Sequence, residues 1–151
     1  MNVLTIPAGD SGILVHRHQL YICPHNSVYE SKLGNHRYLG FRHLIGSIKG
    51  AIDRIYERVK VEDIEFTKSS FTDTIKNHPK LTESEKKVFK EYYLDHKRTF
   101  NEWLPISRYL LVFVSEKQIL PHKPHPPINN TYWAVYDYDD LLYKTVLDKK
   151  N

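Results

Sequence analysis

The chain has 151 residues, of which 40% are hydrophobic and 26% charged, and a chain of this length buries roughly 70% of its unfolded surface on folding. These values predict one domain over residues 1–151 and exclude a membrane-spanning helix, because no apolar run approaches ~20 residues. The single cysteine, Cys23, excludes an internal disulfide and a cysteine-type zinc site. We therefore expect a soluble, cytoplasmic protein with no membrane partner.

The net charge of +4 is concentrated near the amino terminus, since residues 1–60 hold eight lysines and arginines against four acidic residues. Five of the nine histidines lie in the same segment. Such a patch suits a polyanion, such as nucleic acid or a nucleotide phosphate. Ordinary solvated charge would give the same pattern, so charge alone leaves both interpretations open.

The first part of the chain has strand-like patterns. Residues 11–24 are rich in β-branched and aromatic side chains and end at Pro24, which predicts one or two strands followed by a loop over residues 24–35. The stretch HRYLGFR, residues 36–42, predicts the next strand. Gly40 within it predicts a bulge or a close approach to the backbone.

Residues 44–66 are ambiguous, because their apolar side chains follow a helical spacing while Gly46 and Gly50 disfavour a helix interior. The β-branched tail of the segment favours strands, with a turn or bulge at residues 46–50. The apolar positions that follow the helical spacing are Ile45, Ile48, Ile52, Ile55 and Val59.

Residues 66–104 predict a helical insertion. A short helix ends at Pro79, and a longer one begins with the capping box of Thr82 and Glu85. One face of the helix over residues 82–104 is apolar and packs on a core, whereas its charged face offers a surface for a protein partner. The apolar face consists of Val88, Phe89, Tyr92, Tyr93, Phe100 and Trp103.

The last part of the chain predicts two more strands. Residues 108–114 form a continuous apolar run that favours a central strand, and the prolines within residues 119–130 exclude regular structure. Residues 132–136 predict a strand, followed by a short helix capped by Asp137, Asp139 or Asp140.

The order of these segments resembles small domains of the PUA-like superfamily, which includes ASCH and EVE-type domains and base-reading modules. The stretches YICP, RYLGF and YLLVFV and the LP…P…I loop carry the resemblance, which spans roughly residues 13–145. It implies an α+β fold with a small, curved, mixed β-barrel, flanking helices and a mouth that takes RNA, a flipped modified base or a small nucleotide. The matching pocket positions are Tyr21, Cys23, Tyr38, Phe41, Arg42 and Trp133.

Alternation along residues 37–42 supports a binding surface on this strand. Arg37, Leu39 and Phe41 share one face, and Tyr38 and Arg42 share the other with Gly40. We expect one core face and one face that presents Tyr38 and Arg42 to a ligand. Aromatic planes stack on bases and cations contact phosphates, although aromatic side chains in strands also serve as ordinary core.

A metal-dependent nuclease is the alternative. The triplets LYI and YLG are faintly similar to the GIY-YIG nucleases, which would give phosphodiester-cleaving roles to Tyr21, Tyr38, Arg54 and Glu57. No glycine precedes Tyr21, and the gap between the triplets is long. A small-nucleotide-binding or protein-interaction module is a further alternative.

The histidines and Cys23 favour structural roles. His16 and His18 would share a strand face, and His122 and His125 lie in the proline loop, but a four-nitrogen metal site from these pairs is less favoured than surface histidines. We therefore expect no metal and no cofactor, and we interpret Cys23 as packed. The predicted function is a non-enzymatic binding module for nucleic acid or a nucleotide-like ligand, with the oligomeric state left open.

Overall fold

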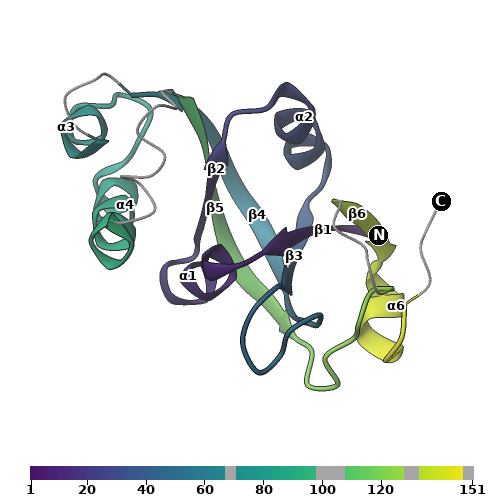
Figure 1. Ribbon diagram of the computed structural model, residues 1–151. Coiled ribbons are helices and arrows are strands. Elements are labelled where there is room, and N and C mark those ends of the chain that lie inside the picture. Colours follow the sequence, from purple (N-terminus) through teal and green to yellow (C-terminus); the bar gives the residue numbers. More distant parts are fainter. Residues whose placement is uncertain (67–70, 98–107, 128–132, 148–151) are drawn as a thin grey trace.

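The computed structural model describes residues 1–66, 71–97, 108–127 and 133–147, whose arrangement is shown in Figure 1. These residues form a mixed α+β fold with helices packed around one six-stranded sheet. The strands are β1 (Asn2–Ala8), β2 (Leu20–Pro24), β3 (Tyr38–His43), β4 (Ile52–Glu65), β5 (Arg108–Ile119) and β6 (Ala134–Asp137). The helices within these ranges are α1 (Asp10–His18), α2 (Ser27–Asn35), α3 (Phe71–Lys76), α4 (Glu83–Asp95) and α6 (Tyr138–Tyr143). None of these helices is both long and apolar enough to cross a membrane.

The sheet is open, with the strand order β2-β5-β4-β3-β1-β6, so β2 and β6 form its edges. The barrel expected from the PUA-like resemblance is therefore not confirmed, because the sheet does not close. The sheet is nevertheless strongly curved, since the rings of Tyr21 on β2 and Phe41 on β3 lie 5.1 Å apart although β5 and β4 separate these strands in the sheet order. Among the strands, β1 and β3 pair in parallel, and α1, β2 and α2 connect them along the chain.

Three clusters of buried side chains surround the sheet. The inner core contains both Tyr21 and Phe41 and receives Val15 from α1 and Leu33 from α2. A helical core joins α3 and α4 to β2 and β5, and a C-terminal core joins α6 to β3, β4 and β6. In Figure 1, helices α3 and α4 of the helical core lie at one end of the molecule, and helix α6 of the C-terminal core lies at the other.

Residues 109–114 of β5 are buried on both faces, which confirms the central strand predicted over residues 108–114. Alternate side chains of its apolar run point into different cores: Tyr109, Leu111 and Phe113 belong to the helical core. Leu110 and Val112 belong to the inner core. A run without polar alternation is expected for a strand that is covered on both sides.

The expected strands over residues 11–24 are confirmed only in the second half, β2. The first half is wrong, because it forms α1, which buries Leu14 and Val15 against two different cores. The helix ends at Gln19, whose φ of 58° is left-handed and whose N–H donates to the Val15 carbonyl. Packing of these apolar side chains therefore overrides the β propensity of the segment.

The loop expected over residues 24–35 is also wrong, since most of it forms α2. Asn26 caps this helix, and its side chain accepts hydrogen bonds from the backbone N–H groups of Val28 and Tyr29. Strand β1 is a further element that the sequence analysis did not predict.

Residues 44–66 confirm the strand interpretation. Gly46 and Gly50 both have positive φ angles, 86° and 88°, in the turn that precedes β4. The pairing of β3 with β4 shifts register between Gly40 and Arg42, which confirms the bulge predicted at Gly40. A Cβ at position 40 would lie 3.2 Å from Cγ2 of Ile52, so the glycine permits this close approach.

The expectation of a single core face on residues 37–42 is wrong. Tyr38, Leu39 and Phe41 are 5%, 0% and 1% exposed, so both faces of β3 are buried. The second face is covered by the C-terminal core, where the Tyr38 ring packs edge-on against Tyr138. Within β3, Arg42 is the one partly exposed residue, and Arg37, which precedes the strand, is exposed.

The helical segment begins as predicted. Thr82 accepts a hydrogen bond from the Glu85 N–H, and the Glu85 carboxylate accepts one from the Thr82 N–H. Phe89 and Tyr92 are buried on the predicted apolar face, whereas Phe100 and Trp103 lie outside the described residues. Of the three aspartates predicted as alternative caps, Asp137 caps α6, accepting from the N–H groups of the other two.

Replacing Thr82 by alanine tests the capping box. The variant loses the side-chain acceptor of the Glu85 N–H, so we expect its free energy of unfolding to fall by about 1 kcal/mol. Urea denaturation followed by circular dichroism measures this change. Lys87→Ala, at an exposed position of the same helix, should change stability by less than about 0.5 kcal/mol, and an equal loss in both variants would contradict the capping role.

Candidate functional site

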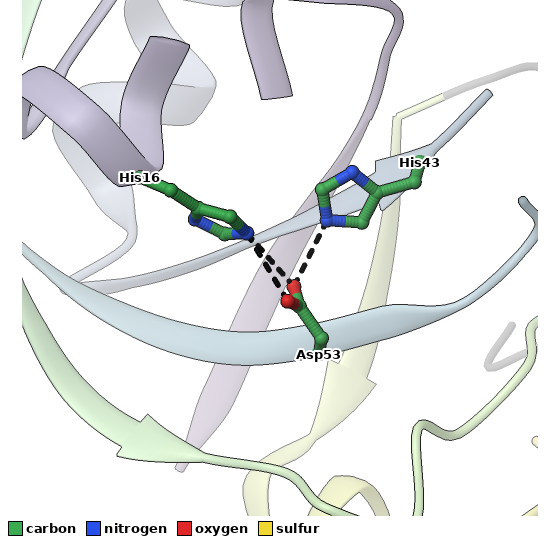
Figure 2. Close-up of side chains that lie close together, drawn as sticks. All are labelled: His16, His43 and Asp53. Carbon is green, nitrogen blue, oxygen red and sulfur yellow. Dashed lines mark hydrogen bonds and ion pairs between the residues drawn. The ribbon is translucent and has the colours of Figure 1, made fainter. Parts of the chain in front are cut away.

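Four polar side chains converge where α1 meets the junction of β3 and β4, and we call them the histidine cluster: His16, His43, Asp53 and Tyr56. His16 lies near the end of α1, His43 ends β3, and Asp53 and Tyr56 lie in the first part of β4. Figure 2 shows both imidazole rings directed at the Asp53 carboxylate from different elements. The turn over residues 44–51 connects the two strands beside the cluster.

Asp53 is the centre of the cluster. Nε2 of His16 lies 3.1 Å from both carboxylate oxygens, and Nε2 of His43 lies 2.9 Å from Oδ1. A carboxylate only accepts hydrogen bonds, so both Nε2 atoms donate in this arrangement. On the far side of the His16 ring, Nδ1 forms a hydrogen bond with the Tyr56 hydroxyl.

The cluster is largely but not fully buried. The side chains of His43, Asp53 and His16 are 3%, 15% and 19% exposed. Burial alone would raise the pKa of Asp53, but hydrogen bonds from the two histidines outweigh it and hold that pKa well below its usual range. Burial raises the pKa of Tyr56, so its hydroxyl keeps its proton at neutral pH.

Arg54 adds a positive charge beside the cluster. Its Nε lies 3.6 Å from Oδ2 of Asp53, and its Nη1 lies 2.5 Å from Oε1 of Glu116. The guanidinium thus lies between two carboxylates, on β4 and β5. This leaves Arg54 paired within the protein.

A hollow adjoins the cluster on the side of the β3–β4 turn, and we call it the Arg42 hollow. Its volume is about 750 Å³, and His43 contributes to both the hollow and the cluster. Its walls combine basic side chains with apolar ones, and among the described residues no carboxylate lines it. The lining residues are Arg42, His43, Leu44, Lys49, Gly50, His125, Pro126, Pro127 and Val146.

Backbone hydrogen bonds hold the two sides of the hollow together. The N–H of Ile52 donates to the Pro124 carbonyl at 2.9 Å, which ties β4 to the proline loop. His125 in turn accepts from the Leu147 N–H and donates to the Thr145 carbonyl. The proline loop is therefore hydrogen-bonded to β4 on one side and to residues 145–147 on the other, although it contains little regular structure.

Arg42 is the distinctive cation of the hollow. Its Nε is buried and has no hydrogen-bond partner among the described residues. Other arginines lie against carboxylates: Arg17 pairs with Asp95, and Arg37 with Glu57. A buried donor without a partner is costly, which makes Arg42 a candidate for binding an acceptor from a ligand.

The residues predicted to bind a ligand are not brought together as one surface. Tyr21, Cys23 and Phe41 pack in the inner core, and Tyr38 packs in the C-terminal core. Arg42 lines its own hollow, and the half-buried Trp133 stacks on Tyr29 with ring centroids 4.0 Å apart.

Tyr21 and Cys23 also border a second, smaller hollow of about 260 Å³, beside Tyr92 and His96. Burial raises the pKa of Cys23 to about 12, which keeps the thiol protonated at neutral pH. This packing agrees with the interpretation of Cys23 as a structural residue.

The four positions of the nuclease alternative do not form one site, although Tyr38 and Glu57 are partners in the β3–β4 pairing. Tyr21 and Tyr38 belong to different cores. Arg54 binds Glu116, and Glu57 accepts hydrogen bonds from Arg37 at 3.2 and 3.0 Å. Arg54 and Glu57 therefore each form an ion pair with another side chain of the protein.

The four-histidine metal site, which the sequence disfavoured, is not formed by His16, His18, His122 and His125 in the described part of the chain. His18 contacts Asp95, with 2.8 Å between Nε2 and Oδ2, and His122 bonds the Leu141 carbonyl. The sequence did not indicate Asp53 and Tyr56 as members of a candidate site, nor His43 as a neighbour of His16. The scarcity of acids was the available signal, since residues 31–60 contain only Asp53 and Glu57.

His25, Glu30 and Asp63 form another polar group, whose nitrogen and oxygen atoms lie close enough together to hold a metal ion. Asp63, however, already receives the Arg108 side chain, with 2.8 Å between Nε and Oδ1 and a second hydrogen bond from Nη2. This arginine lowers the pKa of Asp63, and burial opposes the effect. The charge of Asp63 is thus paired with that of Arg108 on the neighbouring strand β5.

Comparisons with protein-family models, with curated proteins and with solved structures give no match. The histidine cluster and the Arg42 hollow are the two candidate sites that the described residues form.

The Asp63–Arg108 pair predicts a measurable pH dependence. Because the folded-state pKa of Asp63 lies below its ordinary value of 3.8, its stabilising contribution is present above about pH 4 and is lost as the pH falls further. The interval from pH 5 to pH 2.5 extends about one unit either side of that ordinary pKa. Over this interval we expect the free energy of unfolding to fall less in Arg108→Gln than in the wild type. Urea denaturation at several pH values measures the difference.

Lys117→Gln is the matched control, because Lys117 is an exposed cation on the same strand. Its pH dependence should follow the wild type. Parallel stability curves for wild type and Arg108→Gln would contradict the role of the pair.

Proposed function

We propose that the protein is a non-enzymatic binding module for nucleic acid or a nucleotide-like ligand, and that a phosphate group of this ligand binds in the Arg42 hollow. The observation that carries the proposal is the buried Nε of Arg42, which has no partner in the described part of the chain. Lys49 and His125 line the same hollow.

Phosphate suits these groups for geometric and electrostatic reasons. A guanidinium presents several N–H donors in one plane and binds phosphate oxygens through two parallel hydrogen bonds. Lys49 adds a mobile ammonium group, and the lack of a carboxylate among the described lining residues leaves the hollow without local repulsion of an anion. The excess of basic residues in positions 1–60 agrees with this preference.

The apolar wall supports a ligand that carries a flat ring as well as a phosphate. Leu44, Pro126 and Val146 provide apolar surface beside the cations. Nucleotides combine these two features, and binding sites commonly pair apolar walls with a few polar groups. The resemblance to PUA-like domains supports a modified or flipped base as one form of this ligand.

Fluorescence anisotropy with labelled single- and double-stranded RNA and DNA, with and without modified bases, tests the proposal at two salt concentrations. Arg42→Gln should weaken binding by about 10- to 100-fold, because a hydrogen bond to a charged group contributes about 1.5–3 kcal/mol. It should also reduce the slope of log K against log salt by about 1, as expected for one lost phosphate contact. Competition with nucleoside monophosphates and inorganic phosphate separates a polymer from a small nucleotide.

Arg37→Gln is the matched control, because Arg37 flanks the same strand but lies against Glu57. Its affinity should remain within about twofold of wild type, a difference below ~0.5 kcal/mol. The proposal is overturned by the absence of binding to every probe, or by equal losses in the two variants when both retain the wild-type melting temperature.

A further inference from the structure

We propose that His16, His43 and Asp53 bind one divalent transition-metal ion. This inference goes beyond ligand binding in the Arg42 hollow, because His16 and Asp53 do not line that hollow and only His43 is common to both sites. The nearest nitrogen and oxygen atoms of the three side chains all lie within 4.8 Å of one another. They come from α1, β3 and β4, so the fold itself brings them together.

The spacing of the ligand atoms fits a common ion. Nitrogen and oxygen ligands lie about 2.0–2.2 Å from zinc, so two ligands of one ion are roughly 3.0–3.5 Å apart. The distances from Asp53 to the two Nε2 atoms are 2.9 and 3.1 Å. An ion can therefore replace the two hydrogen bonds with small movements of the side chains.

The chemistry of the ligands selects the class of metal. Two imidazole nitrogens and one carboxylate favour zinc, cobalt or ferrous iron, whereas magnesium and calcium prefer oxygen ligands. Three protein ligands leave coordination positions for water or a ligand, an arrangement typical of reactive rather than purely structural zinc sites. The 15% and 19% exposure of Asp53 and His16 leaves the cluster a side open to solvent.

Neighbouring groups hold the two rings in place. When an ion takes the lone pair of His16 Nε2, the ring proton occupies Nδ1, where the oxygen of Tyr56 accepts it. Such outer hydrogen bonds orient metal-binding histidines. A Cβ on Gly12 of α1 would lie 3.1 Å from Nδ1 of His43, so the helix backbone packs closely against the second ring.

The group of His25, Glu30 and Asp63 provides a contrast. Its carboxylate on β4 is held by two hydrogen bonds from Arg108, which an ion would have to displace. Among the described arginines and lysines, the one that pairs with Asp53 is Arg54, whose Nε is more distant at 3.6 Å and whose guanidinium also binds Glu116. The histidine cluster is therefore the better site of the two.

Cobalt binding to the untagged full chain tests the inference. After treatment with a chelator and buffer exchange, Co²⁺ is titrated and followed by its visible absorption, and equilibrium dialysis gives the number of ions bound. We expect one ion per chain in the wild type and at least a hundredfold weaker binding in His16→Gln and Asp53→Asn. Tyr56→Phe keeps all three ligands and should weaken binding by about 10- to 100-fold.

His18→Gln is the matched control, because His18 lies on the same helix and also contacts an aspartate. Its affinity for Co²⁺ should equal that of the wild type. The inference is overturned if the wild type binds no Co²⁺, if Asp53→Asn binds as tightly as the wild type, or if His18→Gln and His16→Gln lose affinity equally. Repeating the nucleic-acid titration in chelator separates the two proposals, since binding in the Arg42 hollow does not require the ion.

Discussion

Strand β4 pairs with β5 along most of its length, yet it shifts register twice, between Ile55 and Tyr56 and between Arg58 and Lys60. Each shift bends and twists the strand locally. The first part of β4 pairs with β3 as well, whereas the part after Lys60 pairs with β5. One long strand thereby joins the β2–β5 part of the curved sheet to the β3–β1–β6 part, and β2 approaches β3 across the inner core.

The candidate site depends on this bend. Ile52 and Ile55 point into the C-terminal core, while Tyr56 points into the inner core. Between Ile52 and Ile55, where the pairing with β3 also shifts register, Asp53 reaches the side of the sheet covered by α1, where His16 and His43 satisfy its carboxylate. Buried polar groups require such partners, so the cluster also holds α1 against the sheet. The β3–β4 turn then places Arg42 and Lys49 at the hollow beside His43.

Local signals in the sequence identified the elements whose structure depends on nearby residues. The continuous apolar run of β5, the capping box of α4 and the Asp137 cap of α6 were all recognisable. Gly46 and Gly50 marked the turn before β4, since both adopt positive φ. Helix α1 was missed because β-branched side chains such as Ile13 and Val15 favour strands locally, and only packing onto two cores decides the outcome.

The histidine cluster could not be predicted for a related reason. His16 and Asp53 are 37 residues apart, and the expectation that His16 lies on a strand gave its side chain the wrong direction and the wrong partners. The parallel pairing of β1 with β3 and the bend in β4 are long-range features with no local signature. Arg42 was predicted as a binding residue from alternation and charge, and its partner residues in the hollow come from the β3–β4 turn and the proline loop.

The central claim is that a phosphate-bearing ligand binds in the Arg42 hollow. A titration of the ¹⁵N-labelled protein with a nucleoside monophosphate, followed by backbone amide chemical shifts, tests it most directly. We expect saturable shifts centred on Arg42, Lys49, Gly50 and His125, with no change at Tyr21–Cys23 beside the second hollow. Shifts confined to the second hollow, or no shifts with any nucleotide, would contradict the account.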